Sequence, residues 1–334
     1  MVGLLTRLLV GLNRPVKLPS KTVAIVVPVS RRTGLTAEEE VSMRHLLRFL
    51  GRHDKYLIAP PGGRCDFAGF AVRHFSRKYF GSTRAHDRLL FLPKFWETFG
   101  DYKYILIYHL DALVFRDELL RWCQMDLDYI GAPWIRCSDT PWVREDEERV
   151  GNGGFALIKV ESVLRVLRNR YLDEPGRYWK DRLGHPLDSL RPILEFLGQH
   201  APTWLSERMR HVVRTQLNKV EKMEVDVCKN DIFLSFHAKK YYPGFKVADF
   251  KTGLSFAFEA APRKCFELNG GNLPFGCHAW TRYDRGFWEP WLLSPDGWAE
   301  TGRGSLADPQ TLEVGPETAM SAAMDGPNTR QTGR

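Results

Sequence analysis

The sequence predicts an α/β fold, with a mixed, mostly parallel sheet flanked by helices and a helical insertion. Residues 22–29 (TVAIVVPV) and 104–108 (YILIY) are apolar or aromatic almost without interruption. Such runs are typical of strands covered on both faces, as in parallel sheets. The pattern strand, helix, strand over residues 22–59 supports the same class, because a parallel pair needs a crossover connection.

The first crossover is delimited by local signals. Thr36 is a good N-cap, acids follow it in the first helical turn, and Gly51 is placed to end the helix. A second strand is expected over residues 55–59, closed by prolines and glycines. The chain therefore begins with a β-α-β unit.

Basic side chains follow this unit and the first strand. Ser30 and Arg31 come directly after the first strand, where they either contact a phosphate or nucleotide base or form a solvated basic turn. Arg84 and Arg88 continue the basic character near a helix predicted over residues 86–99 and interrupted by Pro93. These arginines are candidates for neutralising a diphosphate.

The strand at residues 104–108 and the polar residues after it organise the chain. His109 and Asp111 are separated by one leucine, and the apolar run then resumes. A carboxylate between apolar segments needs a partner, since burying it unpaired is costly. A divalent cation carrying a diphosphate is one such partner, because hard cations prefer oxygen ligands. The alternative is that Asp111 caps a helix or turn beginning near Ala112.

Residues 151–158 (GNGGFALI) join three glycines and an asparagine to a predicted strand. Glycines let a backbone approach a ligand closely, and Asn152 offers both donors and acceptors. The pattern is neither GxGxxG nor a Walker loop, and an ordinary hairpin or bulge explains it equally well. Further helices are expected over residues 117–122 and 161–169, and a strand running into a turn over residues 128–134.

Two later polar residues lie in apolar surroundings. Asp231 directly precedes an apolar run, so it either opens a helix or turns its carboxylate into a cleft as a general base. His278 lies among aromatic residues in PFGCHAW, where it is either a satisfied structural histidine or a ligand.

The composition limits the partners and the location. The 334 residues are 43% hydrophobic and carry a net charge of +8, which favours an anionic partner such as a nucleotide diphosphate, an acidic glycan, a lipid surface or nucleic acid. Six cysteines without a CxxC pair favour reduced thiols and a cytoplasmic location. No apolar run is long enough to span a bilayer, although the apolar N-terminus allows peripheral association with a membrane.

We expect three parts along the chain. Residues 1–20 form an N-terminal extension and residues 21–298 one α/β domain, with a helical insertion over about residues 170–222. Residues 299–334, rich in Gly, Thr, Pro, Ala and Gln, are expected to be a disordered tail.

Five motifs in a fixed order resemble the nucleotide-sugar glycosyltransferases of GT-A fold. They are YHLDALVF (108–115), DYIGAPW (128–134), GNGGF (151–155), NDIF (230–233) and PFGCHAW (274–280). More narrowly, they resemble a group of GT-A-like proteins catalogued mainly as a domain of unknown function. The resemblance implies a GT-A (Rossmann-like) fold over most of the chain.

The resemblance also implies a donor and metal site. Asp111 matches the aspartate of a DxD-like motif that holds a divalent cation, Mn²⁺ or Mg²⁺, and the donor diphosphate. His109 stands where the first acid of that motif is expected, among the donor-binding residues. His278 matches a late histidine that completes the metal shell.

For the sugar and the acceptor, the resemblance implies a second set of residues. Asn152, Gly153 and Gly154 match a loop that lines the donor sugar and the acceptor, and Trp134 is grouped with them. Asp231 matches the acid that deprotonates the acceptor hydroxyl in inverting enzymes.

The leading hypothesis is therefore a metal-assisted glycosyltransferase that moves a sugar from a nucleotide-diphosphate donor to a glycan or lipid-linked acceptor. A non-catalytic glycan- or nucleotide-binding protein on the same scaffold is the alternative, because His109 and Asn230 stand where acids are expected. A nucleic-acid or membrane-surface module is the third hypothesis and rests on the basic charge. It predicts steep salt dependence, and we do not expect a nucleic-acid partner.

Overall fold

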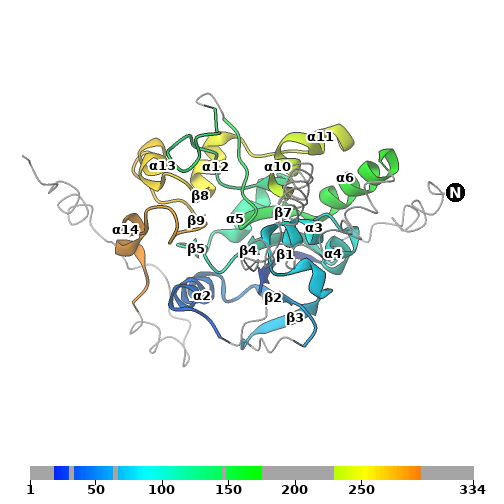
Figure 1. Cartoon of the computed structure of the whole chain (residues 1–334), viewed down its shortest axis with the longest axis horizontal. Coiled ribbons are helices and arrows are strands. Elements are labelled where there is room, and N and C mark those ends of the chain that lie inside the picture. Colours follow the sequence, from blue (N-terminus) through cyan, green and yellow to red (C-terminus); the bar gives the residue numbers. More distant parts are fainter. Residues whose placement is uncertain (1–18, 30–33, 63–66, 145–147, 175–228, 295–334) are drawn as a thin grey trace, which may run out of the picture. The chain divides into compact units, whose positions relative to one another are not determined.

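A six-stranded sheet forms the centre of the structure, a computed structural model that describes residues 19–29, 34–62, 67–144, 148–174 and 229–294 (Figure 1). Its strand order is β3-β2-β1-β4-β7-β6. The strands are β1 (Lys21–Pro28), β2 (Asp54–Ala59), β3 (Phe70–His74), β4 (Tyr102–Tyr108), β7 (Phe155–Lys159) and β6 (Tyr129–Ile130). Strands β1 to β4 are parallel, whereas β7 is antiparallel to both of its neighbours. The predicted mixed, mostly parallel sheet is confirmed.

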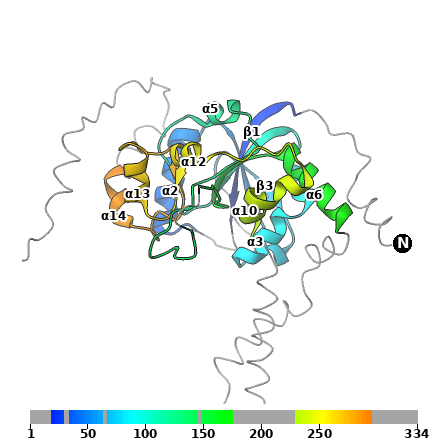
Figure 2. The ribbon, with the colours of Figure 1, turned by 90° about the horizontal axis from the view of Figure 1, so that it is seen from above.

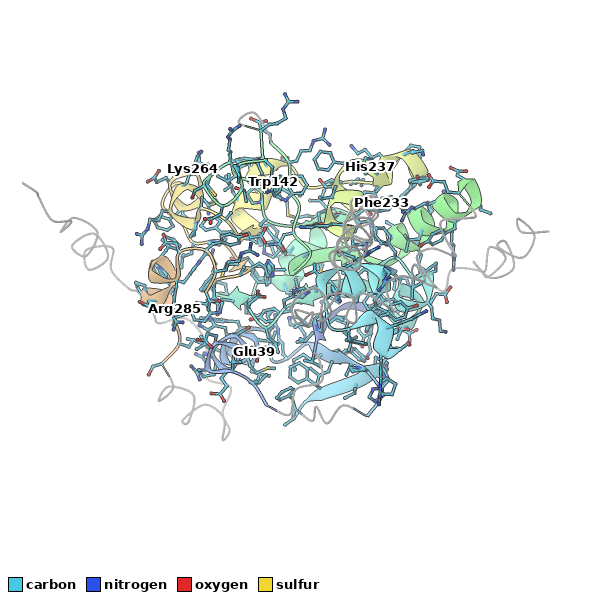
Figure 3. All side chains as sticks on the ribbon, in the orientation of Figure 1. Glu39, Trp142, Phe233, His237, Lys264 and Arg285 are labelled. Atoms are coloured by element: carbon cyan, nitrogen blue, oxygen red, sulfur yellow. The ribbon has the colours of Figure 1, made fainter. Side chains whose placement is uncertain are left out.

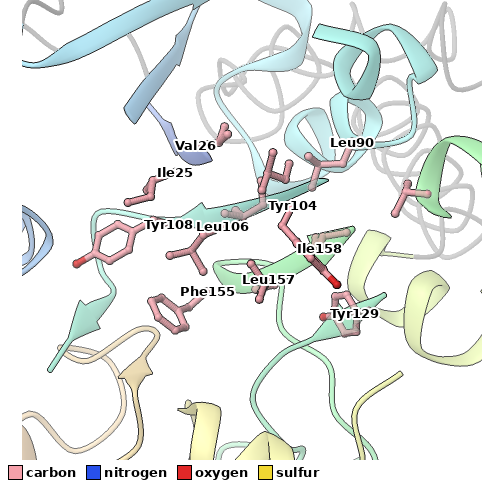
Figure 4. Close-up of a cluster of buried hydrophobic side chains, with 14 of the residues drawn as sticks. Ile25, Val26, Leu90, Tyr104, Leu106, Tyr108, Tyr129, Phe155, Leu157 and Ile158 are labelled. Carbon is pink, nitrogen blue, oxygen red and sulfur yellow. The ribbon is translucent and has the colours of Figure 1, made fainter. Parts of the chain in front are cut away.

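The central strands are formed by the apolar runs of the sequence. Residues 23–27 of β1 and 104–108 of β4 are all buried, and Leu106 lies in register with Ile25 on one side and Leu157 on the other. Figure 4 shows these side chains together with Tyr129 of β6 and Leu90, which comes from a flanking helix. Each such side chain stabilises the fold by roughly 1.5–3 kcal/mol on burial, so this strand order is strongly favoured.

Helices cover the sheet on both sides. They are α2 (Ala37–Leu50), α3 (Thr83–Leu90), α4 (Pro93–Thr98), α5 (Leu119–Gln124), α6 (Val160–Asp173), α10 (Asn230–Ile232), α11 (Ala238–Tyr241), α12 (Phe250–Phe256), α13 (Pro262–Leu268) and α14 (Arg285–Trp288). Short 3₁₀ turns η1 (Arg77–Tyr79) and η4 (Glu289–Trp291) and a π-helix, η3 (Phe233–His237), complete the described chain. Figures 1 and 2 both place α3, α6 and α10 on one side of the sheet and α2, α12, α13 and α14 on the other.

Most predicted boundaries hold, and the exceptions have physical reasons. Thr36 caps α2 with a complete capping box, in which the Glu39 amide donates to the Thr36 hydroxyl and the Glu39 carboxylate accepts from the Thr36 amide. The predicted interruption at Pro93 divides residues 83–98 into α3 and α4, because a proline is favourable at the first position of a new helix and not inside an existing one. Strand β3 was not predicted, since it is an edge strand with mostly exposed side chains.

Only the first residues of the predicted helical insertion lie in the described part of the chain. Residues 170–173 belong to α6 (Val160–Asp173), so the described part of the chain reaches only the start of the predicted insertion. The remainder of the insertion lies outside the described residues, as do residues 1–18 of the predicted extension and the predicted tail. Among the described residues, no helix has the length and hydropathy that crossing a membrane requires.

A second, three-stranded sheet in the order β5-β9-β8 lies beside the carboxyl end of β4. It comprises β5 (Leu113–Val114), β8 (Ala257–Phe258) and β9 (Gly276–Cys277). Strand β9 is parallel to β8 and antiparallel to β5. The start of β5 and the ends of β8 and β9 therefore lie at the same end of this sheet. The residues before β5, after β8 and after β9 are far apart in the sequence but meet there.

Candidate active site

A cavity of about 690 Å³ lies where the order of the parallel strands reverses. From β1 the chain moves to β2 and β3 on one side and then returns to β4 on the other side. Ligands of open α/β sheets bind at such a switch point, beyond the carboxyl ends of the strands. Residues that directly follow β1 and β4 line this cavity: Val29, His109, Leu110 and Asp111.

Other walls of the cavity come from the starts of two helices and from aromatic side chains. The start of α2 contributes Thr36, Glu38 and Glu39, and the start of α3 contributes Ser82, Thr83 and His86. Aromatic surface comes from Phe67, Tyr79 and Phe80. The volume is in the range of sites that hold small molecules or cofactors, and the lining combines aromatic and polar groups as such sites do.

The turn after β4 is held by three parts of the structure. The His109 amide donates to the Gly154 carbonyl at 2.8 Å, and the Trp280 amide donates to the Asp111 carbonyl at 3.1 Å. The Tyr108 hydroxyl shares its one hydrogen between the carbonyls of Ala112 and Ser42, each at 3.0 Å, and accepts from the Ser42 hydroxyl at 3.1 Å. The side chains of His109 and Asp111 are therefore presented from a fixed backbone.

The small sheet brings Asp111, Glu259 and His278 together. Asp111 lies two residues before β5, whereas Glu259 and His278 directly follow the paired strands β8 and β9. His278 Nε2 lies 3.2 Å from Asp111 Oδ1, and its Nδ1 lies 2.9 Å from Glu259 Oε1. The imidazole of His278 is thus bonded at both nitrogens to carboxylates.

These contacts oppose the effect of burial on protonation. Burial alone would lower the pKa of His278, but its hydrogen bonds to Asp111 and Glu259 raise that pKa to about 10. Burial would likewise raise the pKa of Asp111, but the hydrogen bond and positive charge of His278 hold it at about 2. His278 and Asp111 therefore form an ion pair in the structure as it stands.

His109 joins this pair from the side of β4. Its ring contacts His278 edge to face with centroids 5.5 Å apart, and its Nε2 lies 3.4 Å from Nε2 of His86. Burial lowers the pKa of His109 well below its usual value, and the charges of His86 and His278 lower it further. His109 is consequently neutral, which is the form that binds metals.

His109, Asp111 and His278 fit a divalent cation. Each offers one ligand atom, and these atoms all lie within 4.8 Å of one another. Two ligands on adjacent positions of one ion, each about 2.1 Å from it, are separated by about 3 Å, and Nε2 of His278 and Oδ1 of Asp111 are 3.2 Å apart. Glu259 accepts from the second nitrogen of His278, which is the arrangement that orients metal-bound histidines. Two imidazoles and one carboxylate suit Mn²⁺ or Zn²⁺ better than Mg²⁺.

The glycine-rich segment 151–154, which we term the strap, contacts this cluster. The Asn152 side-chain oxygen accepts from the amides of Gly154 at 2.7 Å and Phe155 at 3.3 Å. A Cβ on Gly154 would lie 2.0 Å from Nε2 of His278, whereas a Cβ on Gly153 would meet nothing within 4 Å. The side-chain nitrogen of Asn152 is buried and has no hydrogen-bond partner in the described part of the chain. The strap therefore packs against His278 and contains one buried donor that no described group satisfies.

Asp231 lies on α10, beyond the direct contacts of the cluster. Its carboxylate accepts from the Ile232 amide at 2.8 Å. Burial raises its pKa, and the negative charge of Glu259 raises it further. The neighbouring Asp87 accepts from the Asn230 amide at 3.1 Å, and burial raises its pKa to about 7. Asp231 is thus coupled to the cluster through the charge of Glu259.

The remaining predicted site residues are distributed differently. Ser30 and Arg31 lie outside the described residues. Arg84 and Arg88 lie on α3, but the described lining of the cavity includes neither of them. Trp134 stacks on Phe236, with ring centroids 5.1 Å apart, and abuts the strap at Gly151.

Sequence reasoning did not identify Glu259 or His86, and it grouped His109 with the donor-binding residues, whereas the structure also places His109 beside Asp111 and His278. The spacing His109-Leu110-Asp111 was a usable signal, because alternate residues after a strand share one side. Glu259 follows a strand of only two residues, which leaves no pattern in the sequence.

Comparison with known proteins gives one family match and several distant structural similarities. A family model described as "Protein of unknown function (DUF5672)" matches residues 69–278. No curated protein matches the sequence. Among solved structures, the chain is similar to the apo form of the glycosyltransferase GlyE of Streptococcus pneumoniae TIGR4, with 15% identity and a TM-score of 0.35. A second GlyE structure gives 14% identity and a TM-score of 0.37.

In both GlyE comparisons the match covers 84% of this chain and 62% of the GlyE chain. The galactosyltransferase LgtC, in complex with donor and acceptor sugar analogues, gives 13% identity and a TM-score of 0.39 over 83% of this chain and 99% of that chain. These structural neighbours are glycosyltransferases.

Proposed function

This chain belongs to the DUF5672 family, whose description assigns no function, and from its site we propose that it is a metal-assisted glycosyltransferase using a nucleotide-diphosphate sugar. The observation that carries the proposal is the position of the His109, Asp111 and His278 cluster. It borders a cavity at the switch point of the sheet, where a nucleotide would place its phosphates beyond β1 and β4.

The shape and lining of the cavity support a nucleotide donor. The aromatic side chains of Phe67, Tyr79 and Phe80 offer surfaces for a base. The hydroxyls of Thr36, Ser82 and Thr83 offer hydrogen bonds to a ribose. Asp111 and His109 lie in the same lining, so a donor bound there would have its diphosphate at the metal cluster.

In this proposal the cluster holds the cation, and Glu259 and the strap position the cluster. His109, Asp111 and His278 would hold the cation, which when bound supplies positive charge for the departing diphosphate. Glu259 orients the His278 ring by accepting a hydrogen bond from its Nδ1–H. The Gly154 carbonyl of the strap accepts from the His109 amide, and this bond would fix His109 relative to His278.

Asp231 is the proposed base toward the acceptor hydroxyl. Burial and the charge of Glu259 raise its pKa, and a carboxylate with a raised pKa is a stronger base. Asp231 would therefore accept the proton of the attacking hydroxyl. A glycan or lipid-linked acceptor would have to approach from the side of α10 and the strap.

The experiment is a screen of donors by thermal shift, with and without Mn²⁺. A ligand that binds only the folded protein raises its melting temperature by mass action. We expect a UDP- or GDP-sugar to stabilise the protein only when Mn²⁺ is present, and Asp111→Asn to remove this stabilisation. Failure of every UDP- and GDP-sugar to bind or to be turned over would contradict the proposal.

The variant Asp231→Asn separates catalysis from binding. It should abolish turnover and leave the donor-dependent thermal shift in place, because Asp231 lies outside the described cavity lining. Donor binding without turnover in the wild-type protein, over many acceptors, would instead support a non-catalytic nucleotide- or glycan-binding protein. The position of His109 where an acid was expected is the observation that favours this second candidate.

A further inference from the structure

Three aromatic side chains beside the strap have no part in the proposed donor site. Trp134, Trp142 and Phe236 contact one another and are here termed the aromatic platform. Trp142 is 63% exposed, more than any other large hydrophobic side chain in the described residues (Figure 3). Removing apolar surface from water stabilises a fold, so an indole left this exposed does not contribute to folding.

Trp142 is presented by an anchored turn. The next residue, Val143, is buried, and its amide donates to the Thr140 carbonyl at 3.1 Å. The Thr140 hydroxyl donates to the carbonyl of buried Ile135, and its amide donates to the Cys137 carbonyl at 3.1 Å. The position of the exposed indole is therefore set by contacts on both sides of it.

Trp134 connects the exposed indole to the body of the protein. It meets Trp142 edge to face, at 5.8 Å and 76° between rings, and stacks on Phe236 at 5.1 Å and 23°. The guanidinium of Arg149 lies 4.3 Å from the centre of the Phe236 ring. A Cβ on Gly151 would lie 2.4 Å from the Trp134 ring, so this ring rests directly on the strap. The platform is a row of three contacting rings with the exposed Trp142 at one end.

The platform is continuous with the proposed site through two segments. The strap contacts Trp134 at Gly151 and His278 at Gly154, and three residue steps span at most about 11 Å. Phe236 lies on η3, which continues the helix that carries Asp231. Single π-helical turns of this kind are frequent at functional sites.

We propose that the aromatic platform is a carbohydrate subsite, in which the C–H face of one pyranose ring of a glycan stacks on the indole of Trp142. The face of an aromatic ring is electron-rich and attracts C–H groups, which carry a small positive charge. This inference rests on the proposed function, because it assigns the acceptor: a glycan whose reacting hydroxyl lies toward Asp231 while a sugar ring of the same chain rests on Trp142.

The surroundings of the platform favour a glycan over a membrane or a protein partner. Arg144, Glu148 and Arg149, which follow Trp142 closely in the sequence, are exposed and charged. One indole among charged side chains does not form the continuous apolar surface that a protein interface or an interfacial helix requires. Charged side chains of this kind form hydrogen bonds with the hydroxyl groups around a sugar ring.

The test measures glycan binding independently of donor binding. Wild-type protein, Trp142→Ala and Trp142→Phe are applied to a panel of immobilised oligosaccharides of glucose, galactose, mannose and N-acetylglucosamine. Met125→Ala is the matched control, because Met125 is 45% exposed and precedes Asp126, which pairs with Lys103 at the opposite end of β4. The melting temperature and the Mn²⁺-dependent donor shift of each variant are recorded in parallel.

We expect Trp142→Ala to weaken glycan binding by about tenfold or more, in line with the loss of one ring from an aromatic stacking site. Trp142→Phe should retain most of the affinity, and Met125→Ala should match the wild type. None of the three should change the donor shift, and Asp111→Asn should retain glycan binding. The last variant distinguishes the two proposals, since loss of the donor site leaves the platform intact.

Three results would overturn the inference. One is equal glycan affinity of Trp142→Ala and the wild type. Another is the absence of binding of the wild type to every oligosaccharide in the panel. The third is a Trp142-dependent binding to vesicles of phosphatidylcholine and phosphatidylglycerol in place of glycans, which would assign the platform to a membrane surface.

Discussion

Two histidines, one fully buried and one partly buried, show how the same side chain has different roles in two regions of this molecule. His45 of α2 is fully buried, its Nδ1 donates to the Val114 carbonyl at 2.9 Å, and its Nε2 accepts from the Leu293 amide at 3.0 Å. His278 borders a cavity-lining residue, Asp111, and both of its nitrogens face carboxylates. Burial lowers the pKa of His45 to about 4, whereas hydrogen bonds to the carboxylates outweigh burial and raise that of His278 to about 10.

The difference lies in the hydrogen-bond partners of the two rings. Backbone groups satisfy a neutral imidazole completely, so His45 joins α2, β5 and the chain near Leu293 and has no capacity for a ligand. Carboxylates hold His278 in place and surround it with negative charge. A metal cation that replaces a proton of the imidazole can neutralise this charge. A buried histidine between carboxylates is therefore a candidate ligand, and one between backbone groups is structural.

The largest effect is expected where the backbone closes on His278. Gly154→Ala would place a methyl group 2.0 Å from Nε2 of a ring that two carboxylates hold in position. We expect Mn²⁺ affinity to fall by at least about 100-fold, with a loss of about 1–3 kcal/mol in the free energy of unfolding from overpacking. Calorimetric titration with Mn²⁺ and denaturant unfolding measure the two effects.

Gly153→Ala is the matched control for this change. A Cβ at Gly153 meets no atom within 4 Å, so the variant should bind Mn²⁺ like the wild type and unfold within about 0.5 kcal/mol of it. If Gly154→Ala and Gly153→Ala behave alike, the strap does not support the metal cluster.

The second largest effect concerns His45 and pH. Its pKa is about 4 in the folded protein and 6.5 in the unfolded chain, so the unfolded chain binds more protons between these values. The stability that neutral His45 provides is complete above pH 6.5 and is lost as the pH falls toward 4. This difference of about 2.5 pKa units corresponds to about 3 kcal/mol.

The measurement compares the wild type with His45→Gln. The free energy of unfolding is determined by urea between pH 4 and pH 7, where the amide of glutamine does not titrate. The difference between the two proteins should shrink as the pH falls, because only the wild type loses stability through this group. A constant difference over this interval would show that His45 remains neutral in both states or charged in both.

The same contrast explains which parts of the molecule were predictable from sequence. Strands β1 and β4 are continuous apolar runs, and Asp111 and His278 are polar residues in apolar contexts, so both kinds of feature carry a local signal. Strands β5, β8 and β9 have two residues each and exist because tertiary pairing forms them. Glu259 depends on that pairing, and no local pattern could have assigned it to His278.

A smaller effect is expected from the carboxylate behind His278. Glu259→Gln keeps an oxygen that can accept from Nδ1 but removes the negative charge, so His278 becomes a weaker ligand. Mn²⁺ affinity should fall by roughly 10- to 100-fold. Glu267→Gln, on the exposed surface of α13, removes the same charge elsewhere and should leave the affinity unchanged. Equal affinities of the two variants would remove Glu259 from the metal site.

The smallest effect lies at the end of α2 that borders the cavity, about two and a half helical turns from His45. Thr36→Ala removes the hydroxyl that accepts from the Glu39 amide at 3.3 Å and should lower the free energy of unfolding by about 1 kcal/mol. Thr36→Ser keeps the hydroxyl and should remain within a few tenths of a kcal/mol of the wild type. Because the cap satisfies backbone groups, as His45 does, neither variant should alter Mn²⁺ affinity. A loss of Mn²⁺ affinity in Thr36→Ala alone would show that this end of α2 belongs to the metal site, and the separation between structural and ligand-binding regions would then have to be drawn further from the cavity.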